Sequence, residues 1–433
     1  MGTMKTLLRA SLCIVVTAGA VLAGCGGDSG NKGAPVDGGG GDGGASSGGS
    51  GGGSGSGSGG SSSSGSSSGS SSGSGSGSSS GGTDGGTPMK AGNPDGSCSA
   101  GVPTQGQPAS TSNPTTVVGT GTAASCAFGL LAAAVTKGGI ITFDCGSAAV
   151  TIPVTSTLKV PIDRNTVIDG GNKVTLDGGK AVQILSFNSP NFQANENGLT
   201  LQHISLANGK MTPTEAIPTA PAPCSQGWDD GEGGALYMRD GNLTVIDSIF
   251  TNNEAALLGP DTGGGAIYML GSKHGALIVS STFTNNTASN AGAVGGLYAE
   301  LDVYNSLFTG NTAAGNGANN NDPTKCSAMN NGQNEVGSGG NGGALYSDGN
   351  SVNVVLCGDA INDNAAGVGA FGGGLFFTSD NMAGTLTITD TTMMGNTGGH
   401  WTNASTGVMN AGTAIGVNAK SITVTNSMLQ GYP

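Results

Sequence analysis

Two short phrases alternate through the second half of this 433-residue chain, and they limit its possible folds more than any other feature. The first phrase is a run of alternating apolar residues that ends in Phe-x-x-Asn or a close variant. Its copies begin at Leu199, Leu243, Leu277, Leu301, Val352, Leu386 and Ile422, and the first and last copies are degraded. The second is a glycine phrase such as GGALYM. Its copies begin at Gly233, Gly264, Gly295, Gly342 and Gly372.

The spacing of these phrases predicts a repeated turn with one loop of variable length. The asparagines that close the first phrase are Asn253, Asn286, Asn311, Asn364 and Asn396, at spacings of 33, 25, 53 and 32 residues. The segments alternate with period 2, are rich in Val, Ile and Thr, and are broken by Gly and Asn, as is typical of strands. Too few residues separate them for crossover helices, so the pattern predicts an all-β parallel β-helix.

The phrase residues have definite roles in such a coil. Equivalent positions on successive turns stack at about 4.8 Å. We therefore expect Phe250, Phe283 and Phe308 to stack in the interior, followed by Ile361 and Met393. The corner asparagines should form a ladder of amide hydrogen bonds, which satisfies buried polar groups. The glycine pairs should supply positive φ at the next corner.

The segment that precedes the repeats predicts a short capping α-helix. Phe128, Leu131, Ala132 and Val135 fall on one helical face. Ser125 is placed to cap the N-terminus, and Lys137 with Gly138 marks the end. A helix here would cover an otherwise open edge of the β-helix.

The alternating phrases resemble the repeat of the polymorphic outer-membrane-protein adhesins. More broadly, they resemble the pectate-lyase-like superfamily, which implies a single-stranded right-handed parallel β-helix. The stretches GGIITFDCGSAAVTI and DRNTVIDGGNKVTLDGG are similar to the first turns of that group. The resemblance covers roughly residues 120–433 and is specific for the fold, because the scaffold carries both enzymes and non-enzymes.

The N-terminus has the features of an export signal. Lys5 and Arg9 precede a short apolar run that ends in Leu-Ala-Gly-Cys at Cys25, which resembles the lipobox of bacterial lipoproteins. The resemblance implies that residues 1–24 are removed and that Cys25 is lipidated. Gly26, where the inner-membrane retention signal has Asp, implies an outer-membrane and cell-surface location. An ordinary secretory signal is the alternative.

Residues 25–97 follow as a tether, and residues 98–433 form the β-helix domain. The tether consists almost only of Gly and Ser, so it cannot bury side chains and should stay disordered. The chain has a net charge of −13, which loss of Lys5 and Arg9 would change to −15. This charge and the scarcity of Lys and Arg argue against a nucleic-acid partner. The membrane is the expected partner, through the lipid, and the domain is expected to be a monomer.

Six cysteines remain after the signal and the lipid site: Cys98, Cys126, Cys145, Cys224, Cys326 and Cys357. An even number in an exported protein indicates disulfides, with 15 possible connectivities. Pairs that close moderate loops are preferred: Cys126–Cys145 and Cys326–Cys357, which leaves Cys98–Cys224. A zinc site is disfavoured, because the chain has no C-x-x-C pair and three His.

Enzymes of the resembling superfamily act on polysaccharides. Lyases need an Arg or Lys base with Ca²⁺ held by carboxylates, and hydrolases need paired Asp with a His and a basic pair. The folded region has two arginines, Arg164 and Arg239, and lacks the G-H-G and Arg-x-Lys elements. The pairs Asp169-Gly170 and Asp177-Gly178 are typical of turns between short strands.

One insertion still carries candidate chemistry. Trp228, Asp229, Asp230 and Glu232 close a Pro- and Thr-rich loop, and Arg239 follows within the next strand. The acids could serve as catalytic groups or bind Ca²⁺, and the Trp could stack on a sugar ring. The plainer interpretation is a solvated acidic loop with a Trp that covers apolar surface.

Trp401 follows His400 in the last loop and has the same two interpretations, ligand binding or surface packing. Taken together, the sequence predicts a tethered, non-catalytic module for adhesion or cell-envelope binding that needs no cofactor. Its ligand would be a polysaccharide or another cell-surface molecule. The alternatives are a carbohydrate-active lyase or hydrolase that depends on Ca²⁺, and a purely structural spacer.

Overall fold

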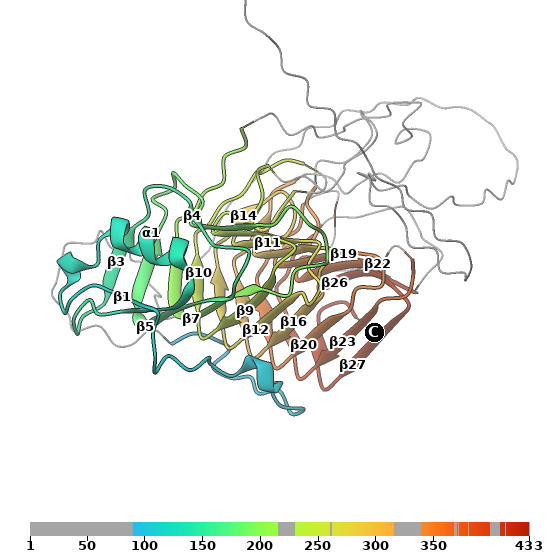
Figure 1. Ribbon diagram of the computed structural model, residues 1–433. Coiled ribbons are helices and arrows are strands. Elements are labelled where there is room, and N and C mark those ends of the chain that lie inside the picture. The colour runs from blue at the N-terminus through green and yellow to red at the C-terminus, as the bar shows by residue number, and fades with distance from the viewer. Residues whose placement is uncertain are drawn as a thin grey trace, which may run out of the picture. The chain divides into compact units, whose positions relative to one another are not determined.

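The computed structural model describes residues 90–214, 230–259, 262–315, 339–367, 370, 372–379, 381–398, 408–411 and 413–432. All of them belong to one compact unit. They form a parallel β-helix, as the alternating phrases predicted (Figure 1). One full turn consists of β12 (Ala276–Val279), β13 (Thr282–Thr284), β14 (Thr287–Ala288) and β15 (Val294–Leu297). The next turn begins with β16 (Leu301–Tyr304), which pairs with β12 in parallel.

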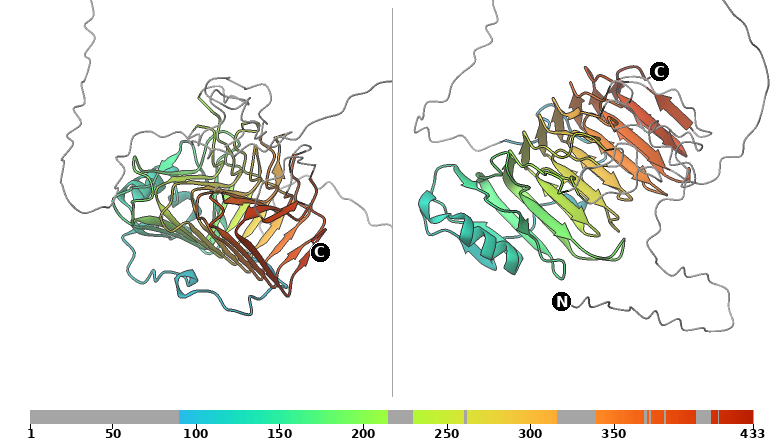
Figure 2. Two further views of the ribbon diagram at one scale, coloured as in Figure 1. Left: turned by 90° about the vertical axis from the view of Figure 1, so that its right-hand side faces the viewer. Right: turned by 90° about the horizontal axis from the view of Figure 1, so that it is seen from above.

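Two long sheets run along the coil and a third pairs two short strands; Figure 2 shows strands of successive turns side by side, from green to red. Sheet 1 further contains β1 (Thr116–Val118), β2 (Gly139–Phe143), β3 (Val150–Pro153), β5 (Thr166–Asp177), β7 (Gly198–Ala207), β9 (Asn242–Ile246), β10 (Ile249–Thr251), β17 (Leu307–Thr309), β20 (Val354–Cys357), β21 (Ala360–Asn362), β23 (Thr385–Thr389), β24 (Thr392–Met393), β27 (Ser421–Thr425) and β28 (Met428–Leu429). Sheet 2 further contains β4 (Leu158–Lys159), β6 (Leu185–Asn188), β8 (Leu236–Arg239), β11 (Ile267–Leu270), β19 (Leu345–Gly349), β22 (Leu375–Ser379), β26 (Ile415–Ala419) and β25 (Val408–Ala411). Sheet 3 pairs β14 with β18 (Thr312–Ala313). β25 runs antiparallel to β26 and so closes one edge of sheet 2.

The interior contains the predicted aromatic stack. The ring centroids of Phe250 and Phe283 lie 4.8 Å apart, and those of Phe283 and Phe308 lie 4.7 Å apart. The rings of both pairs are nearly parallel. Ile361 pairs in register with Phe308, and Met393 is fully buried on the following turn. The repeat therefore places one large apolar side chain in the core at each turn.

The corner asparagines form the predicted ladder. The Nδ2 of each donates to the Oδ1 of the next, over 2.9–3.1 Å, from Asn253 through Asn286, Asn311 and Asn364 to Asn396. Each Oδ1 also accepts the backbone N–H of the preceding asparagine at 3.0 Å. All five side chains are buried, so the ladder satisfies groups that water does not reach.

A second polar ladder lies one corner earlier and has no counterpart in the sequence predictions. Its members are Ser248, Ser281, Ser306, Asp359, Thr391 and Ser427. Each backbone N–H donates to the side chain of the next member, and the hydroxyls donate back to the carbonyl two residues earlier. Asp359 replaces a hydroxyl in this column and is buried.

The glycine phrase supplies positive φ at four corners and fails at one. Gly233, Gly264, Gly342 and Gly372 have φ of 66° to 73°. The copy predicted to begin at Gly295 is out of register, because Gly295 pairs with Tyr268 and Tyr346.

Ala291, with φ of 50°, takes the corner position in that turn. Tyr298 consequently lies past the strand, where its ring and that of Phe192 form a T-shaped pair with 5.6 Å between centroids. The glycine pair at residues 295 and 296 matches the phrase by residue type, but it does not determine which residue occupies the corner.

The capping helix is α1 (Phe128–Lys137), which buries Leu131 and Val135 in the core. It ends at Gly138, with φ of 70°, as predicted. The predicted cap at Ser125 is wrong, because Ala127 precedes the helix and Ser125 lies in a 3₁₀ helix, Ala123–Ser125. The Ser125 hydroxyl instead accepts from the Thr120 N–H and donates to the Thr122 carbonyl.

Two disulfides join the described cysteines. Cys126 bonds to Cys145, as predicted. Cys98 bonds to Cys357, across 259 residues of sequence, so the preferred pairs Cys326–Cys357 and Cys98–Cys224 are wrong. Cys224 and Cys326 themselves lie outside the described residues.

Candidate functional sites

Asp230 lies where the chain returns from the Trp- and acid-bearing insertion, and it is hydrogen-bonded to Thr214 at the start of that insertion. Its Oδ1 and Oδ2 accept the Thr214 N–H at 3.0 and 2.8 Å, and its Oδ2 also accepts the Thr214 hydroxyl at 3.0 Å. Thr214 is the last described residue before the insertion, and Asp230 is the first after it. The carboxylate thus ties the two ends of a 15-residue excursion together.

Glu232 and Arg239 occupy different parts of the next strand. Glu232 is 1% exposed and precedes β8, and its carbonyl accepts a hydrogen bond from the Gln183 amide. Arg239 is the last residue of β8 and pairs in register with Asn188 and Leu270. Both side chains engage in interactions within the protein.

The remaining predicted site residues lie outside the described part of the chain. They are the lipid site Cys25, the acid Asp229, and the two ring candidates Trp228 and Trp401. Their proposed roles stay predictions.

A cluster that sequence reasoning missed lies on sheet 1, where three successive turns bring an imidazole between two carboxylates. His203 Nδ1 is 3.1 Å from Asp169 Oδ1, and His203 Nε2 is 3.7 Å from Asp247 Oδ2. Gln202 donates to the other Asp169 oxygen at 2.8 Å. Burial raises the pKa of Asp247, and His203 opposes that shift. The arrangement thus places an imidazole within reach of two carboxylates.

The signal for this cluster was present in the sequence. The copies LTLQH and LTVID align His203 with Asp247, and both residues have positive φ at the same corner. Asp169 was predicted as a turn residue, and its Oδ1 does accept the Gly171 N–H at 2.9 Å. Alignment of the degraded first copy was therefore the missing step.

Two further carboxyl groups have perturbed acidity. Burial raises the pKa of Asp359 to about 8, although the Ser306 and Cys357 N–H groups donate to it. Burial raises the pKa of Asp302, on the outer side of β16, to about 6, and repulsion from Glu300 adds to the shift. In both groups, exclusion of water favours the protonated form more than it is favoured in an exposed carboxyl group.

The outer side of sheet 2 carries a column of aromatic side chains. Tyr237, Tyr268, Tyr346 and Phe376 occupy the same register position, and Gly295 interrupts them. Each ring-bearing residue is 4% exposed or less, and the rings of Tyr346 and Phe376 are stacked with centroids 5.3 Å apart. These aromatics are thus packed rather than offered to a ligand.

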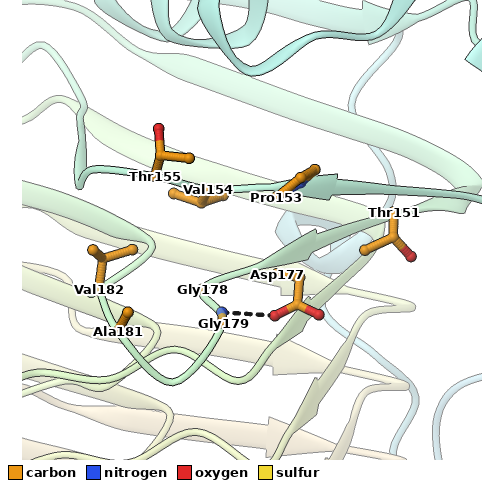
Figure 3. Close-up of a pocket in the computed structure, with 9 residues that line it drawn as sticks. All are labelled: Thr151, Pro153, Val154, Thr155, Asp177, Gly178, Gly179, Ala181 and Val182. Carbon is orange, nitrogen blue, oxygen red and sulfur yellow. Dashed lines mark hydrogen bonds between the residues drawn. The ribbon is translucent and has the colours of Figure 1, made fainter. Parts of the chain in front are cut away.

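A shallow pocket of about 510 Å³ lies between two early turns (Figure 3). Thr151, Pro153 and Thr155 form one side, and Ala181 and Val182 form the other. Asp177 lies at its edge, but its Oδ1 accepts the Gly179 N–H at 2.7 Å and Asn208 donates to both oxygens. The carboxylate therefore stabilises a turn.

Within the described residues, no three or more His, Cys, Asp or Glu side chains gather closely enough to hold a metal ion. The helices of this same part of the chain include none long and apolar enough to cross a membrane. Comparison with protein-family models, with curated proteins and with solved structures found no match to this chain.

Proposed function

We propose that this protein is a lipid-anchored surface module that binds a polysaccharide or another cell-envelope molecule without turning it over. In this proposal Cys25 carries the lipid, and the Gly/Ser-rich segment spaces the β-helix from the outer membrane. The module acts as a monomer and does not engage nucleic acid.

The observation that carries the proposal is the set of hydrogen bonds that Thr214 donates to the Asp230 carboxylate. A catalytic acid or base must be within reach of a substrate atom with its proton or lone pair available. Both Asp230 oxygens are instead engaged by Thr214, at the two ends of the insertion. This contact supports an insertion that is displayed on a fixed base, because binding residues are commonly carried by loops on a rigid scaffold.

The test compares two variants that weaken this contact by different chemistry. Thr214→Ala removes the hydroxyl donor, and Asp230→Asn removes the charge but keeps one acceptor oxygen. If the contact positions a binding loop, both variants should weaken binding to a polysaccharide panel several-fold. Neither the wild-type protein nor either variant should release products. Turnover by the wild-type protein that Asp230→Asn loses and Thr214→Ala keeps would contradict the proposal.

A carbohydrate-active enzyme is the second candidate, and the Asp169–His203–Asp247 cluster is the observation that favours it. An imidazole held between carboxylates can serve in acid–base catalysis at a glycosidic bond or beside it. Release of unsaturated products or reducing ends that His203→Ala abolishes, with or without Ca²⁺, would establish this alternative. Saturable binding by the wild-type protein without release of either product supports the non-catalytic module.

The anchor is tested separately from the ligand. Metabolic labelling with a radioactive fatty acid in a bacterial host should label the wild-type chain and leave Cys25→Ala unlabelled. Fractionation should then place the wild-type chain with outer membranes. Equal labelling of both chains would contradict the lipid site.

A further inference from the structure

The N-terminal segment of the described structure folds back along the outer side of sheet 1. This strap, residues 92–109, is the blue segment that passes across successive strands in Figure 1. It lies over a column of outward-facing residues, Gln202, Ile246, Val279, Tyr304 and Cys357, which share one register position on five successive turns. The strap therefore spans the coil before the first strand, β1, begins.

The strap covers this column closely. Gln202, Ile246, Val279 and Cys357 face outward yet are at most 4% exposed. Gly106 lies so near that an added Cβ would be 2.8 Å from a Val279 methyl group. The backbone N–H and carbonyl of Ala109 both bond to the Gln202 amide, at 2.9 and 3.1 Å. Four of the five column residues are thus buried against the strap.

The end of the strap nearer the chain's N-terminus is fixed more strongly. Asn93 bonds to the carbonyls of Asn305 and Gly358, and the Cys98 N–H donates to Asn305 Oδ1 at 2.7 Å. Ser99 donates to Asp390, which lowers the pKa of that carboxyl. The Cys98–Cys357 disulfide then joins the strap covalently to β20.

We propose that the strap and its disulfide form a mechanical clasp, which passes a pull on the N-terminal tether directly into β20. The inference rests on the proposed function only in taking the N-terminus as the anchored end. A force between the two chain ends enters at Cys98, crosses the disulfide and continues from Cys357. Residues 99–356, which contain β1 to β19 and the Trp-bearing insertion, are thereby shielded from the load.

The clasp changes which strand first bears a pull on the N-terminus. β1 has three residues and pairs with β2 along one edge. Without the disulfide, a pull at the N-terminus would peel the strap and then open this short pairing one hydrogen bond at a time. β20 is instead held between β16 and β23, in four-residue registers on both sides. The clasp moves the point of loading from an edge to the middle of the coil.

Single-molecule force spectroscopy on the full chain, held at both ends, tests the proposal. The oxidised protein should unfold only its C-terminal turns. Cys98→Ser/Cys357→Ser should extend by an additional length of roughly 790–860 Å, from 240 residues at about 3.3–3.6 Å each, because the Cys126–Cys145 disulfide remains in this variant and keeps 19 of the 259 residues closed. Its first unfolding event should also move to lower force and come from the N-terminal end.

Two controls keep the test decisive. Cys126→Ser/Cys145→Ser removes a disulfide inside the shielded region, and it should leave the extension of the oxidised chain unchanged. Dithiothreitol added to the held wild-type protein replaces the double variant if that variant does not fold. An equal first unfolding force with and without the Cys98–Cys357 bond overturns the clasp. Because no ligand takes part, this result is independent of whether the binding assay succeeds.

Discussion

Each buried corner asparagine satisfies two neighbours at once, and this sets the consequence of replacing one. Asn311 accepts from Asn286 and donates to Asn364, and its Nδ2 also reaches the Phe283 carbonyl. Removal of its amide would leave donors and acceptors unpaired on adjacent turns. Burial without a partner costs about 1–3 kcal/mol for each such group.

We expect Asn311→Leu to lower the free energy of unfolding by roughly 2–5 kcal/mol, because it leaves more than one buried polar group unpaired. Chemical denaturation measures this change. Asn113→Ala, on an exposed asparagine, is the matched control and should change the value by about 0.5 kcal/mol or less. Equal effects of the two variants would contradict the structural role of the ladder.

Asp359 makes stability depend on pH. Its folded-state pKa is about 8, above the ordinary value of 3.8, so the folded state binds more protons than the unfolded state between these values. Stability must therefore fall as pH rises through this window, by up to about 1.4 kcal/mol per pH unit. Tyr304, whose pKa is raised by burial and by Asp302 and Asp359, is the titratable neighbour on the adjacent turn.

Asp359→Ser restores the hydroxyl found elsewhere in that column and removes the titrating group. We expect the wild-type protein to lose more stability than the variant between pH 5 and pH 8.5, measured by denaturant titration at each pH. Parallel pH profiles would show that Asp359 is not the source of the dependence.

At the scale of the strand, the two faces of one short element should differ sharply in energetic weight. Phe283 lies in the interior stack, whereas its neighbour Thr284 faces outward and donates to the Thr251 hydroxyl. We expect Phe283→Ala to cost about 3–5 kcal/mol and Thr284→Ala about 0.2–1 kcal/mol. Thermal and denaturant unfolding of the two variants checks this contrast, and similar losses would contradict the assigned register.

What could be predicted from the sequence follows from what repeats. The phenylalanine stack and the asparagine ladder recur on each turn, so their alignment needed no structure. The turn at Ala291 was misread, because the glycines at 295 and 296 match the phrase by residue type while the strand places Gly295 opposite Tyr268. The hydroxyl ladder was missed since small polar residues carry a weak signal.

The strap and its disulfide could not be predicted, because they do not repeat. Cys98 lies in a segment rich in Pro, Ser and Thr whose partners are 93–291 residues away. A preference for moderate loops misjudged the pairing. Closure entropy grows slowly with loop length, so a loop of 259 residues costs only roughly 2 kcal/mol more than one of about 30.

At the scale of the whole molecule, most distinctive side chains serve the coil itself. Phe250, Phe283 and Phe308 fill its interior, the asparagine and hydroxyl ladders make its corners, and Tyr237, Tyr268 and Tyr346 pack on sheet 2. Residues that recur at every turn are suited to structure, whereas a binding surface needs residues that differ from turn to turn. The insertion fastened by Thr214 and Asp230 is one place where the chain departs from this repetition.

The most direct measurement of the central claim is saturation binding of the purified protein to a polysaccharide panel, with product analysis of the same samples. The proposed module predicts saturable binding to at least one polymer, whose chain length stays unchanged after long incubation with or without Ca²⁺. New reducing ends or unsaturated sugars that accumulate in proportion to protein and vanish in Asp230→Asn or His203→Ala would contradict it.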